Sequence, residues 1–126
     1  MQVYLVKLSG GSVGCGDAIV PVTRHIAPTR APLTAAMHEL LSIKDRVDGQ
    51  TGLYNALYQS DLQVEKITID SGKATILLTG QLMLGGECDN PRIEAQLKQT
   101  ALQFATVKDV AIFVNGTPIE KIISLR

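Results

Sequence analysis

Aromatic residues are scarce in this sequence, with no Trp, three Tyr and two Phe. This scarcity removes most candidates for the stacking platforms on which proteins hold bases or sugars. An excess of one charge is also missing, because 12 Lys and Arg residues balance 12 Asp and Glu residues. A neutral chain without a basic run has no long-range field that would draw in nucleic acid or an anionic membrane. The sequence therefore argues against nucleic-acid binding.

Long apolar runs are absent too, and none approaches the roughly 20 residues that a membrane-spanning helix needs. A leader peptide is not recognisable, because Met1 runs directly into the strand-like stretch at residues 2–6. If the protein is exported, we expect its leader and any membrane tether to belong to a segment missing from this sequence. A length of 126 residues with 45% hydrophobic residues is typical of one domain with one core. We interpret residues 1–126 as a single domain.

Cysteine is limited to Cys15 and Cys88, and neither belongs to a CxxC pair. Together with two scattered histidines they do not form a zinc-binding set, so we expect no metal. Each cysteine lies in a glycine-rich loop, and a disulfide between them would contribute roughly 4 kcal/mol in the chain-entropy treatment. Two unrelated buried thiols are the alternative. The residues alone leave both possibilities open, because the redox compartment decides between them.

Two stretches have the 3.6-residue periodicity of amphipathic helices. The first follows Thr29 as its N-cap, with Pro32 in the first turn, and the second follows Asn90 as its N-cap. The predicted core combines the apolar faces of these helices with those of the strands around them. Its members are Leu33, Met37, Leu40, Ile67, Ile69, Ile76, Leu97, Ala101, Phe104, Val110 and Ile112.

Two-residue turns predict two hairpins in the second half of the chain. Ser71-Gly72 places Asp70 opposite Lys73, and Asn115-Gly116 suits a type I′ turn, which needs positive φ at both positions. The second hairpin would join a central strand at residues 110–114 to a short edge strand at residues 119–122. With two strands before the first helix, the order becomes β-β-α-β-β-α-β-β. This order predicts an α+β fold with two main helices packed on one face of a mixed β-sheet.

Arg24 is the most suggestive polar residue, because it directly follows a predicted strand. Its planar guanidinium suits a clamp for a carboxylate or phosphate, although pairing with a local carboxylate or carbonyl is the interpretation we favour. His25 and His38 are candidate general bases, but no spacing of a nucleophile and a base can be recognised. The carboxylates all lie where turns, caps or exposed helix faces explain them: Asp70, Glu87, Asp89 and Glu94.

Several stretches together resemble the GerMN domain family of bacterial sporulation and spore-germination proteins. They follow one another in the family's order along nearly the whole chain, at residues 3–6, 19–24, 33–41, 67–76, 94–103 and 110–116. The resemblance implies a domain of exported, often lipid-anchored envelope proteins that acts by binding or assembly, without catalytic residues or a cofactor. Arg24 matches the arginine of the family's strand motif and is therefore our candidate binding residue.

The same resemblance implies an extracytoplasmic location, with an envelope protein or a cell-wall component as the partner. Because an exported protein meets oxidising conditions, it favours a disulfide between Cys15 and Cys88 over free thiols. A role in sporulation or germination is a further expectation. The alternative from another functional class is a small thiol- or His-dependent envelope hydrolase that would use one of the cysteines with His25.

Overall fold

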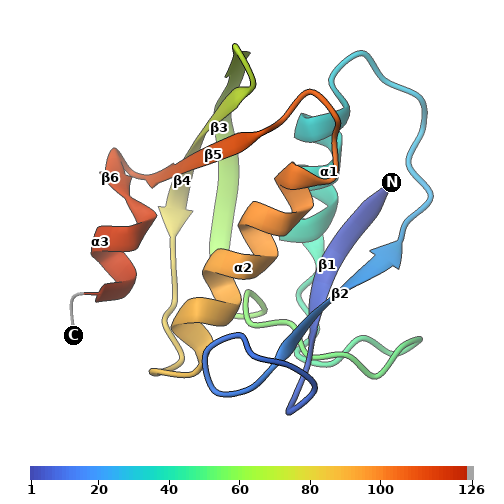
Figure 1. Cartoon of the computed structure of the whole chain (residues 1–126), viewed down its shortest axis with the longest axis vertical. Helices are drawn as coiled ribbons and strands as arrows, with labels where there is room; N and C mark the ends of the chain where they lie inside the picture. Colours follow the sequence, from blue (N-terminus) through green and yellow to red (C-terminus); the bar gives the residue numbers. More distant parts are fainter. Residues whose placement is uncertain (125–126) are drawn as a thin grey trace.

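Hairpins and helices alternate along the chain (Figure 1). The computed structural model describes residues 1–124. Its elements are β1 (Gln2–Lys7), β2 (Ala18–Thr23), α1 (Pro32–Ser42), β3 (Asp61–Asp70), β4 (Lys73–Gln81), α2 (Asp89–Leu102), β5 (Asp109–Val114), β6 (Thr117–Pro118) and α3 (Ile119–Ser124). The α+β class is confirmed, and the first eight elements occur in the predicted order.

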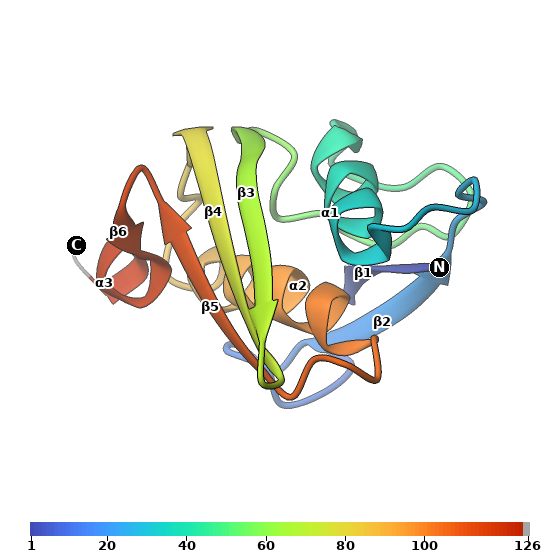
Figure 2. The same ribbon diagram turned by 90° about the horizontal axis from the view of Figure 1, so that it is seen from above.

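The larger sheet is mixed, with the strand order β3-β4-β5-β6. β4 and β5 are parallel, and the other neighbours are antiparallel. The helices α1 and α2 pack on one face of this sheet, as predicted. β1 and β2 form a separate antiparallel ribbon, and the two helices lie between this ribbon and the larger sheet (Figures 1 and 2). The sequence did not predict this separation of the strands.

One hydrophobic core fills the space around the two helices. α1 buries Leu33, Ala36, Met37, Leu40 and Leu41, which confirms the predicted apolar stripe. α2 contributes three fully buried apolar residues, Ile93, Leu97 and Ala101. Of the predicted core, the members that the structure buries are Leu33, Met37, Leu40, Ile76, Leu97, Ala101, Val110 and Ile112.

The β3–β4 hairpin has the predicted register but not the predicted burial. Ile69 lies opposite Ala74 and Ile67 opposite Ile76. Ala74 and Ile76 are fully buried, whereas Ile69 is 44% exposed and Ile67 is half-buried. The turn of the hairpin projects past the ends of α1 and α2 (Figure 1), so the helices do not cover this end of the sheet. The assignment of Ile69 to the core is therefore wrong.

Phe104 is half-buried for a related reason, because it lies beyond the last residue of α2. It packs against the edge of the core and is not one of its buried members. Both Ile69 and Phe104 border an open groove at the start of α1. The predicted periodicity identified the correct face of each element, but it could not show where the covering layer stops.

Both predicted N-caps are wrong. α1 begins after Ala31, and Thr29 Oγ1 accepts a hydrogen bond of 3.1 Å from the Ala31 N–H before the helix starts. Pro32 does occupy the first turn. Asn90 lies inside α2 and its Nδ2 donates to the Ile123 carbonyl oxygen at 3.0 Å. Tertiary contacts therefore determine what this asparagine does.

The C-terminal hairpin is shorter than predicted. Asn115 and Gly116 both have positive φ, 51° and 84°, and Phe113 lies opposite Pro118, the register that a two-residue turn at these positions requires. β6 ends at Pro118, however, and residues 119–122 belong to α3, so the predicted edge strand there is wrong. Proline is favourable immediately before or within the first turn of a helix. The helical turn also buries the Ile119 side chain completely.

Candidate functional site

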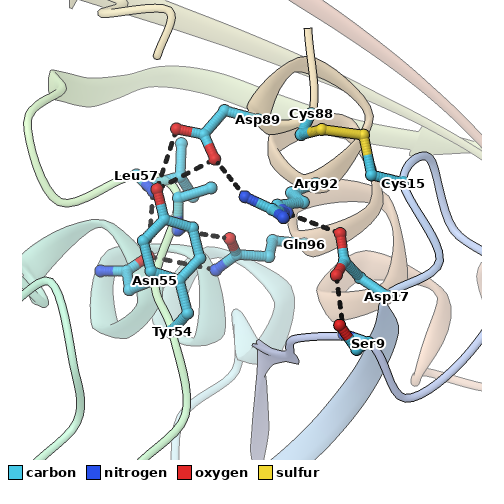
Figure 3. A network of polar contacts seen from close by, with 11 residues as sticks. Ser9, Cys15, Asp17, Tyr54, Asn55, Leu57, Cys88, Asp89, Arg92 and Gln96 are labelled. Carbon is cyan, nitrogen blue, oxygen red and sulfur yellow. Dashed lines mark hydrogen bonds and ion pairs between the residues drawn. A yellow bond between two sulfur atoms is a disulfide. The ribbon is translucent and has the colours of Figure 1, made fainter. Parts of the chain in front are cut away.

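A disulfide joins Cys15 to Cys88 and fastens the loop between β1 and β2 to the start of α2 (Figure 3). The two Cα atoms are 5.5 Å apart. Cys15 is exposed and Cys88 is half-buried. Among residues 1–124 this bond leaves no cysteine free. The pairing that the family resemblance favours is therefore present.

A buried ion-pair network lies beside this disulfide (Figure 3). Arg92, in the first turn of α2, donates from Nε to Asp17 Oδ2 at 2.7 Å and from Nη1 to Asp89 Oδ1 at 2.8 Å. The other oxygen of Asp17 accepts a hydrogen bond of 3.0 Å from the Ser9 N–H. Only 2% of the Asp17 side chain and 15% of the Arg92 side chain are exposed. The loop after β1 is thereby connected to α2 through charge as well as through sulfur.

Tyr54 extends the network on the other side of Asp89. Its hydroxyl donates to the two carboxylate oxygens of Asp89 at 2.9 and 2.8 Å. The guanidinium carbon of Arg92 lies 5.2 Å from the centre of the Tyr54 ring, a cation–π distance. Burial, and then the neighbouring Asp89 carboxylate, raise the pKa of Tyr54 to about 12. The phenol consequently stays protonated and serves as a donor at neutral pH.

Gln96 connects α2 with two further segments (Figure 3). Its Nε2 donates to the Tyr4 carbonyl oxygen at 3.0 Å and to Asn55 Oδ1 at 3.1 Å. Its Oε1 accepts a hydrogen bond of 2.9 Å from the Ala56 N–H. Gln96 and Asn55 are fully buried. A buried amide with all of these partners fixes the path of the loop between α1 and β3.

The charged groups of this network link segments of the chain. The pKa of Asp17 is lowered, first by the hydrogen bond from Arg92 and then by the Ser9 N–H. The pKa of Arg92 is raised, with the Asp17 hydrogen bond as the largest cause. A general acid at neutral pH needs the opposite, a carboxyl group whose pKa is raised. These ions stabilise each other and hold three segments of the chain together.

Arg24 forms a second, smaller ion pair at the end of β2. Its Nη2 lies 3.2 Å from Asp48 Oδ1, and the two side chains are 19% and 9% exposed. Asp48 Oδ2 accepts a hydrogen bond of 3.1 Å from the Thr51 N–H. The pKa of Asp48 is lowered, first by the Thr51 hydroxyl and then, against the effect of burial, by Arg24. The carboxylate partner of Arg24 thus comes from the loop after α1, 24 residues away.

The remaining sequence candidates lie apart from the network, except for Asp89. His25 and His38 are both exposed, the first after β2 and the second on α1. Asp70 lies next to the β3–β4 turn and Glu87 is exposed before α2. Glu94 pairs with Lys98 at 2.9 Å, four residues further along α2. Within residues 1–124 no three His, Cys, Asp or Glu side chains gather as a metal site would require.

Comparison with known proteins assigns the chain to a family. The Germane sequence family, described as sporulation and spore germination, matches residues 2–120. The chain belongs to the Germane family. This result confirms the resemblance to GerMN domains noted from the sequence. No curated protein matches the chain significantly.

Solved structures similar to this Germane domain include two of the sporulation protein GerM from Bacillus subtilis. The structure of its tandem GerMN domains has a TM-score of 0.65 and 24% identity over 93% of this chain, which spans 39% of that structure. The structure of its first GerMN domain has a TM-score of 0.64 and 18% identity, over 94% of this chain and 85% of that one. These likenesses show a shared fold.

A third similar structure is that of a putative lipoprotein from Clostridium perfringens. It has a TM-score of 0.54 and 13% identity, over 93% of the Germane domain and 74% of its own length. Here too the likeness concerns the fold. In the Germane domain, each helix within residues 1–124 is too short or too polar to cross a bilayer.

Sequence reasoning missed most side chains of this network, namely Asp17, Tyr54, Asn55, Arg92 and Gln96. Asp17 and Arg92 are 75 positions apart, and Tyr54 and Asp89 are 35 apart. No local spacing connects such residues. One signal was available, because Asp17 lies close to Cys15 in the sequence and Arg92 lies close to Cys88. A bond between the two cysteines must bring both neighbourhoods together.

Proposed function

We propose that this Germane domain is a non-catalytic binding or assembly module of a bacterial envelope protein that acts outside the cytoplasm. The observation that carries the proposal is the Cys15–Cys88 disulfide. Structural disulfides persist in oxidising compartments and are rare in the cytosol. The names of the similar proteins, a sporulation protein and a putative lipoprotein, agree with a place in the envelope. Membership of a family described as sporulation and spore germination supports a role in those processes.

The non-catalytic part of the proposal rests on how the reactive groups are occupied. Both cysteines are bonded to each other, so the thiol that the hydrolase alternative requires is not available in the oxidised chain. The carboxylates of Asp17 and Asp89 both pair with Arg92. Perturbed pKa values accompany structural ion pairs as well as catalytic sites. Here their direction stabilises the charged forms of both Asp17 and Arg92, which favours the structural role.

Thiol trapping in intact cells tests the compartment. The full-length protein is alkylated in its own host without reductant and then analysed by mass spectrometry. We expect neither Cys15 nor Cys88 to be modified, and both to be modified after reduction and unfolding. The Cys15→Ser variant is the matched control, because it releases one thiol at Cys88. Alkylation of both residues in the untreated wild type would contradict an oxidising location.

Photo-crosslinking tests whether the domain binds a partner. A photoreactive amino acid is introduced singly at exposed positions of the full-length protein, namely Leu8, His25, Ile69, Met83 and Leu102. A binding module should give a discrete adduct from at least one position in the cell envelope. Failure at every position would count against the proposal. Turnover of an ester or amide substrate that is lost in His25→Ala would show an enzyme instead.

Arg24 is the proposed contact for an anionic group on the partner. Its Nε is buried and has no hydrogen-bond partner among the described residues, although Nη2 is held by Asp48. Arg24→Ala should lower the yield of the adduct formed from the neighbouring position His25 more than Asp48→Asn does, because both variants break the ion pair and only the first removes the guanidinium. If the variant only loses stability, Arg24 serves the Asp48 pair alone and makes no contact with the partner.

A further inference from the structure

Two segments of the chain each place a cation followed by an aliphatic residue beside the same depression. Lys7-Leu8 stands at the end of β1, and Arg46-Val47 lies in the loop after α1. Leu8 is 50% exposed and Val47 51%, the highest values for large apolar side chains among the described residues. Both line a depression of about 450 Å³ together with Tyr54. We call Lys7, Leu8, Arg46, Val47, Leu53 and Tyr54 the Leu8–Val47 patch.

The backbone beneath this patch is ordered by antiparallel pairing. Val6 and Tyr54 exchange two N–H···O bonds of 2.8 Å each. On its other side, Tyr54 pairs with Val47, flanked by a bond of 2.8 Å from the Asp48 N–H to the Leu53 carbonyl oxygen. The Tyr54 hydroxyl is anchored to Asp89. A surface held in this way loses little conformational entropy when a partner docks.

The patch also has one sign of charge. The Arg46 guanidinium carbon lies 5.8 Å from the centre of the Tyr54 ring, a cation–π contact that places its charge beside Val47. Lys7 is exposed and follows the buried Val6. None of the residues that line the depression is acidic. The whole chain is neutral, so this local positive charge beside exposed aliphatic side chains is a distinct chemical feature.

We propose that the Leu8–Val47 patch binds an acidic peptide segment of a partner protein, in which Asp or Glu residues flank an aliphatic side chain. The carboxylates would pair with Lys7 and Arg46, and the aliphatic side chain would cover Leu8 and Val47. This proposal rests on the proposed function and names the chemistry of its partner. A peptide suits the patch better than an anionic membrane, because two cations on a neutral chain do not make the broad basic face that lipid binding uses.

Chemical-shift mapping with synthetic peptides tests this proposal. The ¹⁵N-labelled chain is titrated with millimolar acetyl-Glu-Leu-Glu-amide, and acetyl-Lys-Leu-Lys-amide serves as the charge control. We expect saturable shifts that centre on residues 6–8, 46–47 and 52–54, and no saturable shift with the basic peptide. Replacing the central Leu of the acidic peptide with Ser should weaken binding about tenfold, because the buried aliphatic side chain is lost.

Charge reversal provides the readout that a merely structural role would not change. The double variant Lys7→Glu with Arg46→Glu should lose the acidic peptide and bind the basic one. Leu8→Ser with Val47→Ser should weaken binding of the acidic peptide about tenfold or more. The matched control, Ile69→Ser with Lys73→Glu, changes an exposed aliphatic residue and an exposed cation on the β3–β4 hairpin. It should bind like the wild type.

Several outcomes would overturn the peptide proposal. They are no shift at millimolar acidic peptide, shifts centred away from the patch, and equal shifts with the basic peptide. Binding to phosphatidylglycerol vesicles without any response to the acidic peptide would assign the patch to a lipid surface and would also overturn it. The proposed function survives these results if photo-crosslinking still gives an adduct from another position. If no position gives an adduct, the proposed function fails as well.

Discussion

Arg92 Nε donates a hydrogen bond to Asp17 Oδ2 at 2.7 Å, although the two residues are 75 positions apart in the chain. Both side chains are largely buried, and Arg92 also neutralises Asp89. Arg92→Met would therefore leave two carboxylates without their cation. Breaking a buried pair by removing one partner typically costs about 3–5 kcal/mol. We expect a loss of that size in the unfolding free energy, measured by urea denaturation.

A matched variant on the same helix separates this effect from the loss of charge alone. Lys98→Met removes a cation from α2 that pairs with Glu94 and Glu120 on a more exposed surface. Exposed pairs contribute about 0–1 kcal/mol, so the loss should be at most that large. The unfolding free energy of Arg92→Lys should lie between those of the wild type and Arg92→Met. An ammonium keeps the charge but cannot reproduce the planar arrangement of donors with which the guanidinium reaches two carboxylates. Equal losses in Arg92→Met and Lys98→Met would contradict the buried network.

Acid should destabilise the fold through Asp17 and Asp48. The pKa of each is lowered from 3.8, mainly by the hydrogen bond from Arg92 in one case and from the Thr51 hydroxyl in the other. The unfolded chain therefore binds these protons at higher pH than the folded chain. Their contribution to stability is complete above about pH 4 and is lost as the pH falls through the folded-state pKa values.

Urea unfolding at a series of pH values from neutral downward measures this dependence. The wild type should lose stability steeply below about pH 4. Asp17→Asn should be less stable at neutral pH but should lose less on acidification, because one carboxyl group with a lowered pKa is gone. Parallel pH curves for the wild type and the variant would show that Asp17 titrates alike in the folded and unfolded states.

Local chemistry was sufficient to predict the turns and the helix faces. Asn115-Gly116 adopts positive φ at both positions because few other residue pairs accept that conformation. A two-residue turn at Ser71-Gly72 leaves one register for its strands, and Asp70 does lie opposite Lys73. The buried face of α1 followed directly from the spacing of its apolar residues. Such features depend on neighbours within a few positions.

Features that depend on distant partners were missed or wrongly assigned. Asn90 has the composition of an N-cap, yet its side chain binds the Ile123 carbonyl oxygen on α3. Ile119 follows Pro118 in a stretch that suits a strand or a helix, and complete burial favours the helix. The Leu8–Val47 patch arises only because Tyr54 pairs with Val6 of β1 on one side and with Val47 of the loop after α1 on the other. No spacing in the sequence places Lys7 near Arg46.

Leu97 and Ile69 provide a direct test of the corrected core. Leu97 is fully buried on α2, whereas Ile69 is 44% exposed on the projecting hairpin. Leu97→Ala should destabilise the fold by about 2–5 kcal/mol, through lost burial and the cavity that remains. Ile69→Ala should cost much less, about 1 kcal/mol or below, as is usual for a substitution outside the core. Thermal and urea unfolding measure the stability that each variant loses. Losses of similar size would contradict the corrected core.

The last prediction concerns the disulfide between Cys15 and Cys88, which closes a loop with a sequence separation of 73. Cross-linking restricts the unfolded chain more strongly than the folded one, and a loop of this length corresponds to roughly 4 kcal/mol as an upper estimate. Reduction should therefore lower the melting temperature, and Cys15→Ser with Cys88→Ser should reproduce the shift. The double variant should be insensitive to reductant, which makes it the control for other effects of the reagent. An unchanged melting temperature in both cases would contradict the prediction and would mean that the bond restricts the folded chain as strongly as the unfolded one.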